Sequence, residues 1–205
     1  MYRPLKKSFF HQETLLLARN LLGKYLISKK GSLPLVGKIV ETEAYLQNGD
    51  PACHAYKGKT RRNEVMFGPP GHLYIYFTYG MHFCMNLVTE PENTAGAVLI
   101  RAVEPLEGVS ELIHNRLLRS GLKKIDNFNI ANGPAKLCQA FNLSTMENGL
   151  KLSPNGVYIG YKLNEKDIDE KEIGISPRIG ISAGIDLPWR FYIKNNPFVS
   201  KTTNQ

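Results

Sequence analysis

Two glutamates separated by one residue are the first candidates for chemistry in this sequence. Glu41 and Glu43 lie between Gly37 and Tyr45, where β-branched residues alternate with others after Pro34, a pattern that predicts a β-strand. Period-two geometry places both carboxylates on one face, about 7 Å apart, with the ring of Tyr45 beside the second. Because burying an unpaired carboxylate is costly, the pair indicates either a solvated edge strand or an acid with a chemical role.

A polar loop after this strand combines rings with positive charge. Two rings precede four cations within six positions: His54 and Tyr56, then Lys57, Lys59, Arg61 and Arg62. Such a loop can hold the phosphates of a nucleic acid while the rings stack on bases, and it can equally be a solvated basic surface. We predict that the four cations contact DNA phosphates.

An aromatic segment further along the chain predicts a β-hairpin. The run from His72 to Gly80 has the composition of a strand, and the run from Met81 to Val88 has that of its partner, so Tyr79 lies at or near the tip. An aromatic ring at such a tip in a basic protein can act as a wedge between base pairs, although most exposed tyrosines have no such role.

The remaining elements must bring these side chains together. The run from Gly96 to Val103 predicts a strand in which Arg101 alternates with apolar residues, so its guanidinium either pairs with an acid or holds a ligand. Helices are predicted at 8–22, 105–118 and 133–141, and further strands at 25–29, 157–162, 178–182 and 189–194. Hairpins mixed with separated helices favour an α+β fold, and no linker or repeat divides residues 1–205, so one compact domain is expected.

Composition restricts the class of protein. With 205 residues, of which 42% are hydrophobic and 21% charged, the chain has the composition of a soluble globular protein. It contains no segment apolar enough to cross a bilayer and no signal-peptide pattern. Three scattered cysteines fit a cytoplasmic protein, associated with the nucleoid if the source is bacterial. The net charge of +8 favours a polyanionic partner, of which nucleic acid is the commonest.

Motifs along nearly the whole chain closely resemble those of one enzyme family. This is the alkyladenine (3-methyladenine) DNA glycosylase family, the group unrelated to the helix-hairpin-helix glycosylases. The matching positions, in chain order, are His54 and the segments 41–45, 74–81, 83–86, 99–105, 133–140, 177–180 and 189–192. The departures from the family pattern lie mostly in loops.

The resemblance implies a single compact domain around a curved antiparallel sheet, with helices packed about it. It also implies a monofunctional repair hydrolase of double-stranded DNA that flips alkylated or deaminated purines out of the duplex. Hydrolysis of the N-glycosidic bond then leaves an abasic site. We expect a monomer that needs no cofactor, no metal, no membrane and no obligate protein partner.

The resemblance also implies roles for residues at the matching positions. Glu43 would be the general base for the attacking water, and Arg101 and the main-chain carbonyl of Ile179 would help to hold that water. Spacing alone does not rank Glu43 above Glu41, because an ideal strand directs both side chains to the same face. Only the family pattern selects Glu43, and Glu41 is interpreted as structural, paired with a neighbouring basic residue.

The other implied roles concern the damaged base and the DNA. Tyr45, His54 and Tyr76 would form the walls of the pocket for the flipped base. Asn86 would lie against the purine edge and disfavour the exocyclic amine of guanine. Tyr79 would fill the gap left in the duplex.

Alternative functions make different demands on the same residues. A catalytically silent protein that recognises damaged DNA would not need Glu43, and a polysaccharide hydrolase would need two carboxylates that flank a bond, which neighbours on one strand face cannot do. A bifunctional glycosylase would need an amine nucleophile, for which Lys136 is the candidate. A zinc site could be drawn from three histidines and the two glutamates, but the metal-binding spacing is absent: His54, His72, His82, Glu41 and Glu43.

Overall fold

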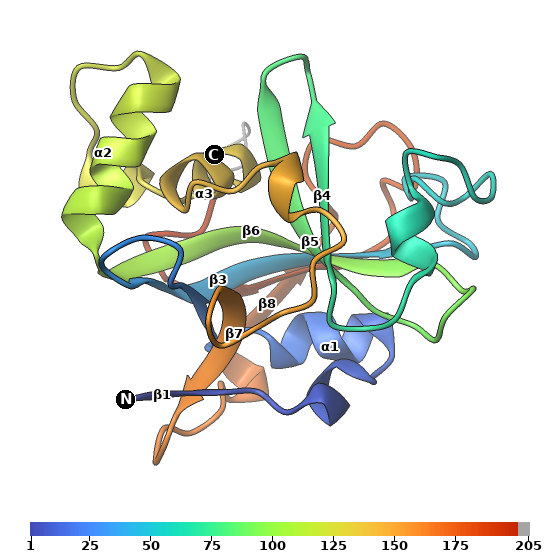
Figure 1. The fold of residues 1–205 in the computed structure, drawn as a ribbon. Coiled ribbons are helices and arrows are strands. Elements are labelled where there is room, and N and C mark those ends of the chain that lie inside the picture. The colour runs from blue at the N-terminus through green and yellow to red at the C-terminus, as the bar shows by residue number, and fades with distance from the viewer. Residues whose placement is uncertain (201–205) are drawn as a thin grey trace.

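The computed structural model describes residues 1–200, and its centre is a pair of long antiparallel strands. β3 (Leu35–Leu46) and β6 (Gly96–Glu107) each contain 12 residues, and most of the side chains on both strands are buried. Both faces of these strands are covered by other elements, which explains why their sequences are rich in β-branched and small apolar residues (Figure 1). The strand predicted around Glu41 and Glu43 is therefore the central strand of the molecule.

Seven further strands extend this pair into one antiparallel sheet. The order is β1-β7-β2-β3-β6-β5-β4, and β9 pairs with both β3 and β8. The first half of β3 pairs with β2 and the second half with β9, so two groups of strands share one edge of β3. The bounds are β1 (Tyr2–Pro4), β2 (Tyr25–Ser28), β4 (Leu73–Thr78), β5 (His82–Val88), β7 (Val157–Lys162), β8 (Ile173–Ser176) and β9 (Arg190–Ile193).

In the part of the chain that the structure describes, three α-helices cover the sheet. α1 (Thr14–Asn20) lies below it in Figure 1, while α2 (Val109–Ser120) and α3 (Pro134–Ala140) lie above it. Up to residue 200 the chain also contains five single 3₁₀ turns: η1 (Lys7–Phe10), η2 (Glu64–Phe67), η3 (Asn127–Asn129), η4 (Thr145–Glu147) and η5 (Glu170–Glu172). The expected α+β class, built on an antiparallel sheet with packed helices, is confirmed. Within residues 1–200, no helix has the length and apolar character needed to span a bilayer.

Two predicted helices begin later than the sequence pattern indicated. The helix expected at 8–22 is divided into η1 and the shorter α1, which begins at Thr14 because the carboxylate of Glu90 accepts hydrogen bonds from both the main-chain N–H and the hydroxyl of that residue. The helix expected at 105–118 begins at Val109, since Pro105 and Glu107 still pair with β3. In both places long-range contacts override the local helical pattern.

The strand predicted at 178–182 is wrong. These residues form a loop, because Pro177 cannot donate a ladder hydrogen bond and Gly180 adopts a positive φ of 75°. The short strands β1 and β8 were not predicted.

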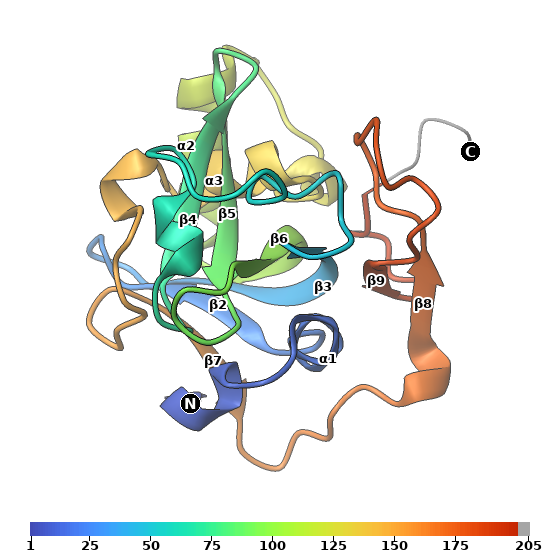
Figure 2. The ribbon, with the colours of Figure 1, turned by 90° about the vertical axis from the view of Figure 1, so that its right-hand side faces the viewer.

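The β4–β5 hairpin projects from the sheet, as Figure 1 shows, and Tyr79 lies at its tip as expected. Tyr79 and Gly80 both have positive φ values, 50° and 68°, which is the pattern of a type I′ turn. The loop that follows β3 runs beside this hairpin (Figure 2), and the side chain of Arg62 reaches the carbonyl of Phe77.

Candidate active site

A pocket of about 440 Å³ opens beside the base of the hairpin. Its walls come from the β4–β5 hairpin, the end of β3, the segment that follows β3 as far as η2, β6, the first residue of α3, and the loop that precedes β9. Among its lining residues are Tyr45, His54, Tyr74, Tyr76, Tyr79, Cys84, Asn86, Leu99, Arg101 and Ile179. The residues expected to bind the damaged base, drawn from distant parts of the sequence, therefore meet in one cavity.

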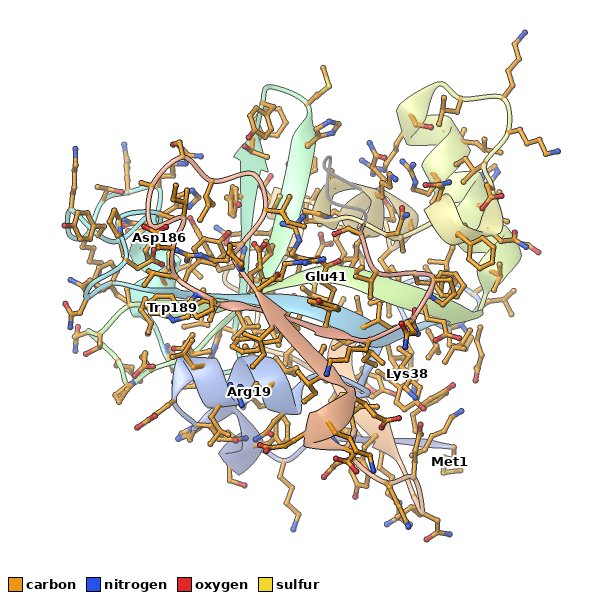
Figure 3. All side chains as sticks on the ribbon, turned by 180° about the vertical axis from the view of Figure 1, so that it is seen from behind. Met1, Arg19, Lys38, Glu41, Asp186 and Trp189 are labelled. Carbon is orange, nitrogen blue, oxygen red and sulfur yellow. The ribbon has the colours of Figure 1, made fainter. Side chains whose placement is uncertain are left out.

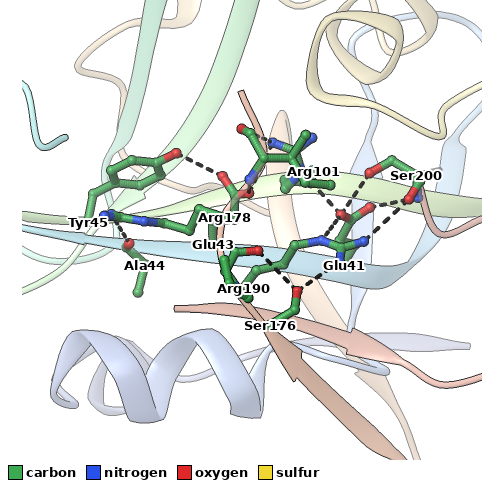
Figure 4. Close-up of polar contacts among 11 residues, drawn as sticks. Glu41, Glu43, Ala44, Tyr45, Arg101, Ser176, Arg178, Arg190 and Ser200 are labelled. Atoms are coloured by element: carbon green, nitrogen blue, oxygen red, sulfur yellow. Dashed lines mark hydrogen bonds and ion pairs between the residues drawn. The ribbon is translucent and has the colours of Figure 1, made fainter. Parts of the chain in front are cut away.

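Glu43 lies directly beneath this pocket and has no accessible surface. Its carboxylate accepts hydrogen bonds from the hydroxyl of Tyr45 at 2.8 Å and from the main-chain N–H of Ile179 at 2.7 Å (Figure 4). The guanidinium of Arg101 forms an ion pair with the same carboxylate, with Nη1 lying 3.2 Å from Oε1 of Glu43. All three partners line the pocket, whereas Glu43 itself is not among the lining residues.

Glu41 occupies a different environment although it lies only two residues away. Its Oε1 accepts from Nε of Arg101 at 3.1 Å and from Nε of Arg190 at 2.6 Å, and both the main-chain N–H and the hydroxyl of Ser200 donate to its carboxylate. The β3–β6 register shifts on both sides of Glu41, so that it pairs with Ala102 rather than with Arg101. Figure 3 shows Glu41 near the middle of the molecule. The predicted pairing of Glu41 with basic residues is present.

The charges of this cluster control the protonation of its members. Burial alone would lower the pKa of the Arg101 guanidinium, but Glu43 and Glu41 outweigh it and the pKa lies above its ordinary value. Burial, together with the charge and the hydrogen bond of Glu43, raises the pKa of the Tyr45 hydroxyl well above its usual range. Tyr45 therefore remains a donor to Glu43 at neutral pH.

Aromatic side chains form one wall of the pocket. The rings of His54 and Tyr76 meet edge to face with centroids 4.5 Å apart, and Nδ1 of His54 lies 2.9 Å from the hydroxyl of Tyr74. Partial desolvation of the ring and the nearby charge of Arg62 lower the pKa of His54 below its ordinary value, so the imidazole is neutral at neutral pH. The wall thus presents ring faces and edges without a positive charge.

Asn86 is fixed in this pocket by its own strand neighbours. Its side-chain amide donates to the carbonyls of Tyr74 at 3.1 Å and of Cys84 at 3.5 Å, and only 3% of the residue is exposed. Because both contacts are with main-chain atoms of the hairpin, the amide has little freedom to move away from a bound group.

Comparison with known proteins identifies the family of this chain. The family model for methylpurine-DNA glycosylases matches residues 8–197. The chain belongs to this family.

Individual relatives are similar to this chain over nearly the whole length of both proteins. A protein of Carboxydothermus hydrogenoformans is 50% identical over 96% of this chain and 98% of its own length. One of Prosthecochloris aestuarii is 49% identical over 96% of this chain and 91% of its own length, and one of Francisella tularensis is 48% identical over 90% and 92%. All three carry the provisional name 3-methyladenine DNA glycosylase.

In this member of the methylpurine-DNA glycosylase family, the residues predicted to face DNA lie outside the pocket or on its rim. Tyr79 is 81% exposed at the hairpin tip and also borders the cavity. The basic loop, defined as Lys57, Lys59, Arg61 and Arg62, is exposed and does not line the cavity. The contact between Arg62 and the hairpin carbonyl of Phe77, at 3.5 Å, places this loop beside the hairpin.

Sequence reasoning missed the residues that support the site from behind. Arg178 and Asp50 form a buried ion pair next to Tyr45, and Arg190 offsets the charge of Glu41. The only signal was that Arg178 and Arg190 lie within family motifs, which does not reveal their partners. Within residues 1–200, no three His, Cys, Asp or Glu side chains gather as a metal site would require.

Proposed function

We propose that this protein is a monofunctional DNA repair glycosylase that hydrolyses the N-glycosidic bond of alkylated or deaminated purines in double-stranded DNA. The observation that carries the proposal is the buried carboxylate of Glu43 beneath an aromatic pocket, hydrogen-bonded to three residues that line that pocket. Membership of the methylpurine-DNA glycosylase family supports the same reaction. An abasic site would be the product.

The damaged purine must first leave the base stack, because its glycosidic bond cannot reach the pocket from within the duplex. The exposed ring of Tyr79, at the tip of a hairpin beside the pocket, is suited to fill the gap and offset part of the lost stacking. The basic loop lies beside the same hairpin and would hold phosphates of the flanking backbone. This arrangement predicts that binding depends on both the wedge and the salt concentration.

The pocket would then select the damaged base. Alkylation of a purine ring nitrogen makes the base cationic, and aromatic faces attract cations by about 0.5 to 2 kcal/mol. The neutral imidazole of His54 and the rings of Tyr45 and Tyr76 provide such surfaces without opposing charge. Asn86, held by two main-chain carbonyls, would resist a purine that carries the exocyclic amine of guanine.

Glu43 would act as the general base for water and stabilise the oxocarbenium character that develops at the sugar. The contact between Arg101 Nη1 and the carbonyl of Ile179 is 3.4 Å, long for a hydrogen bond, so a water molecule could replace it and bridge both groups to the carboxylate. The hydroxyl of Tyr45, the N–H of Ile179 and the guanidinium of Arg101 would hold the carboxylate in a fixed position from which it could accept the proton of that water.

Other functions fit the geometry less well. Glu41 and Glu43 contact the same guanidinium, so they do not flank a bond as the two carboxylates of a polysaccharide hydrolase would. The amine of Lys136 is directed to Asn129 and Asn132 and does not line the pocket, which argues against a lyase nucleophile. We propose a monomeric, single-domain enzyme that acts on DNA in the cytoplasm or nucleoid.

The experiment that tests this proposal is a panel of duplexes, each with one lesion. The lesions would be 3-methyladenine, 7-methylguanine, hypoxanthine and ethenoadenine, assayed with enzyme in excess over DNA. We expect base release from at least one duplex, and strand cleavage only after alkali treatment. Cleavage without alkali would indicate a bifunctional enzyme, and no release from any duplex would contradict the proposed function.

A further inference from the structure

Arg178 joins separate walls of the pocket through contacts that no step of the proposed reaction uses. Its Nη1 and Nη2 each donate to one oxygen of Asp50, both at 2.6 Å, and Nη1 also donates to the carbonyl of Ala44 at 2.9 Å. The guanidinium lies 4.6 Å from the centroid of the Tyr45 ring. The side chains of Arg178 and Asp50 are both fully buried.

Asp50 extends this contact into a second loop. Besides the guanidinium, its carboxylate accepts hydrogen bonds from the main-chain N–H groups of Leu46 at 3.2 Å and Ala52 at 3.1 Å. This loop then continues to His54, which forms part of the pocket wall. A single ion pair therefore fixes the loop that follows β3 to the loop that precedes β9.

The same ion pair contacts a residue adjacent to Glu43 in the sequence and includes a residue adjacent to one of its hydrogen-bond donors. Ala44, whose carbonyl Arg178 contacts, separates Glu43 from Tyr45 in the sequence. Ile179, whose N–H donates to Glu43, directly follows Arg178. Two of the three donors to the Glu43 carboxylate, Tyr45 and Ile179, are therefore adjacent in sequence to Ala44 and Arg178.

We propose that Arg178 and Asp50 are positioning residues that hold Tyr45 and Ile179 on the carboxylate of Glu43. The inference rests on the proposed role of Glu43 as the general base. The guanidinium of Arg178 packs on the Tyr45 ring and so fixes the orientation of that ring. Because Ile179 directly follows Arg178, the same side chain also fixes the position of the Ile179 amide. Asp50 in turn holds the guanidinium of Arg178 through the bidentate contact. Because a general base must meet its water within hydrogen-bond distance, small displacements of these donors would slow the hydrolytic step.

Stability alone does not account for this ion pair. Nε of Arg178 is buried and, within residues 1–200, has no hydrogen-bond partner. Such an unsatisfied donor is a cost, and well-packed apolar residues commonly replace a buried ion pair without loss of stability. A bidentate, planar contact is instead suited to fixing geometry, which a lysine could not reproduce.

The test is the rate of excision per competent active site in Asp50→Asn. Asparagine has nearly the same shape and retains one acceptor oxygen, but it removes the charge and one arm of the bidentate contact. Active sites are titrated with a duplex that carries a tetrahydrofuran abasic-site mimic, and single-turnover excision is measured on the lesion that the wild-type protein removes fastest. We expect the rate per titrated site to fall by about 10- to 100-fold, since displacements of about 1 Å cost rates of this order.

Glu147→Gln is the matched control, because Glu147 is a buried carboxylate that pairs with Lys30 and accepts from the main-chain N–H of Ser144 but does not line the pocket. It should lower the melting temperature and leave the rate per titrated site unchanged. If Asp50→Asn does not fold, Arg178→Lys can be tested instead, because lysine retains the positive charge but cannot form the planar bidentate contact. We expect the same fall in the rate per titrated site.

Two results would overturn the inference in distinguishable ways. A rate per titrated site within twofold of wild type, in a folded variant of either residue, would mean that the ion pair is structural only and would leave the proposed function intact. Absence of excision by the wild-type protein would instead refute the proposed function, and the positioning role would fall with it.

Discussion

Replacing Glu43 with glutamine separates the chemical role of this carboxylate from its role in packing. Glutamine is nearly isosteric, so Oε1 can still accept from the N–H of Ile179 and from Arg101. At the other oxygen, an amide N–H replaces an acceptor, and the hydroxyl of Tyr45 must turn from donor to acceptor. The pocket should therefore keep its shape while losing the carboxylate that we propose takes a proton from water.

The magnitude follows from the contacts of the carboxylate. A positioned general base contributes about 10²- to 10⁴-fold, or about 2.7 to 5.4 kcal/mol of transition-state stabilisation, and excision should fall by that factor. Stability should fall less than when a buried ion pair loses one partner completely, because Arg101 keeps Glu41 at 3.1 Å. We expect a loss of about 1 to 3 kcal/mol rather than the usual 3 to 5 kcal/mol.

The assay compares Glu43→Gln with Glu41→Gln, which removes the same charge from the same guanidinium. Single-turnover excision gives the rate, denaturant unfolding gives the stability, and a duplex with an abasic-site mimic gives the binding affinity. We expect Glu43→Gln to bind the mimic normally and to excise slowly. Glu41→Gln, which disturbs contacts with Arg190 and Ser200, should lose more stability and retain at least tenfold more activity.

Excision by Glu43→Gln at the wild-type rate would refute the assignment of the base. The reverse ranking, with Glu41→Gln inactive and Glu43→Gln active, would show that the two glutamates have been assigned the wrong way round.

Three further predictions concern the DNA and the pocket wall. Tyr79→Ala should weaken capture of flipped bases, with a smaller effect on alkylated bases that unpair easily; gel-shift titrations with both kinds of duplex check this, and unchanged affinity would exclude a wedge. In the basic loop, replacing Lys59 and Arg61 with alanine should reduce the slope of log affinity against log salt by about 2, and an unchanged slope would remove the loop from the interface. Because burial and Arg62 lower the pKa of His54, a cationic base should be excised normally until the pH falls below that pKa, where the imidazolium would repel it. Arg62→Gln should raise this pKa and move the acid-side loss to higher pH, whereas an unmoved pH profile of the single-turnover rate would contradict the effect.

Local sequence patterns predicted the strands that carry this site better than they predicted which residues contact one another within it. The alternation around Glu41 and Glu43 identified the central strand, and the tyrosine-rich run identified the hairpin with Tyr79 at its tip. Both depend on short-range periodicity, which the sequence displays directly. The pairing of Glu43 with Ile179 spans 136 residues, and that of Glu41 with Arg190 spans 149.

No local pattern carries information about contacts of that range, so the ranking of the two glutamates came from resemblance to a family. The same limit explains the error at 178–182. Apolar residues after Arg178 have the composition of a strand, but the arginine side chain turns inward to Asp50, 128 residues earlier in the chain. That contact, together with Pro177 and the positive φ of Gly180, holds these residues in a loop.

The charges beneath the pocket explain why two glutamates on one strand need more than one arginine. Arg101 contacts both carboxylates, and alone it would leave the buried group with a net negative charge. Arg190 adds a second cation on the side of Glu41, so the four side chains, Glu41, Glu43, Arg101 and Arg190, sum to zero. Since these four groups are neutral as a whole, we expect any affinity of the pocket for a cationic base to come mainly from its aromatic walls, and the proposed role of Glu43 requires only its own carboxylate beside the bound water.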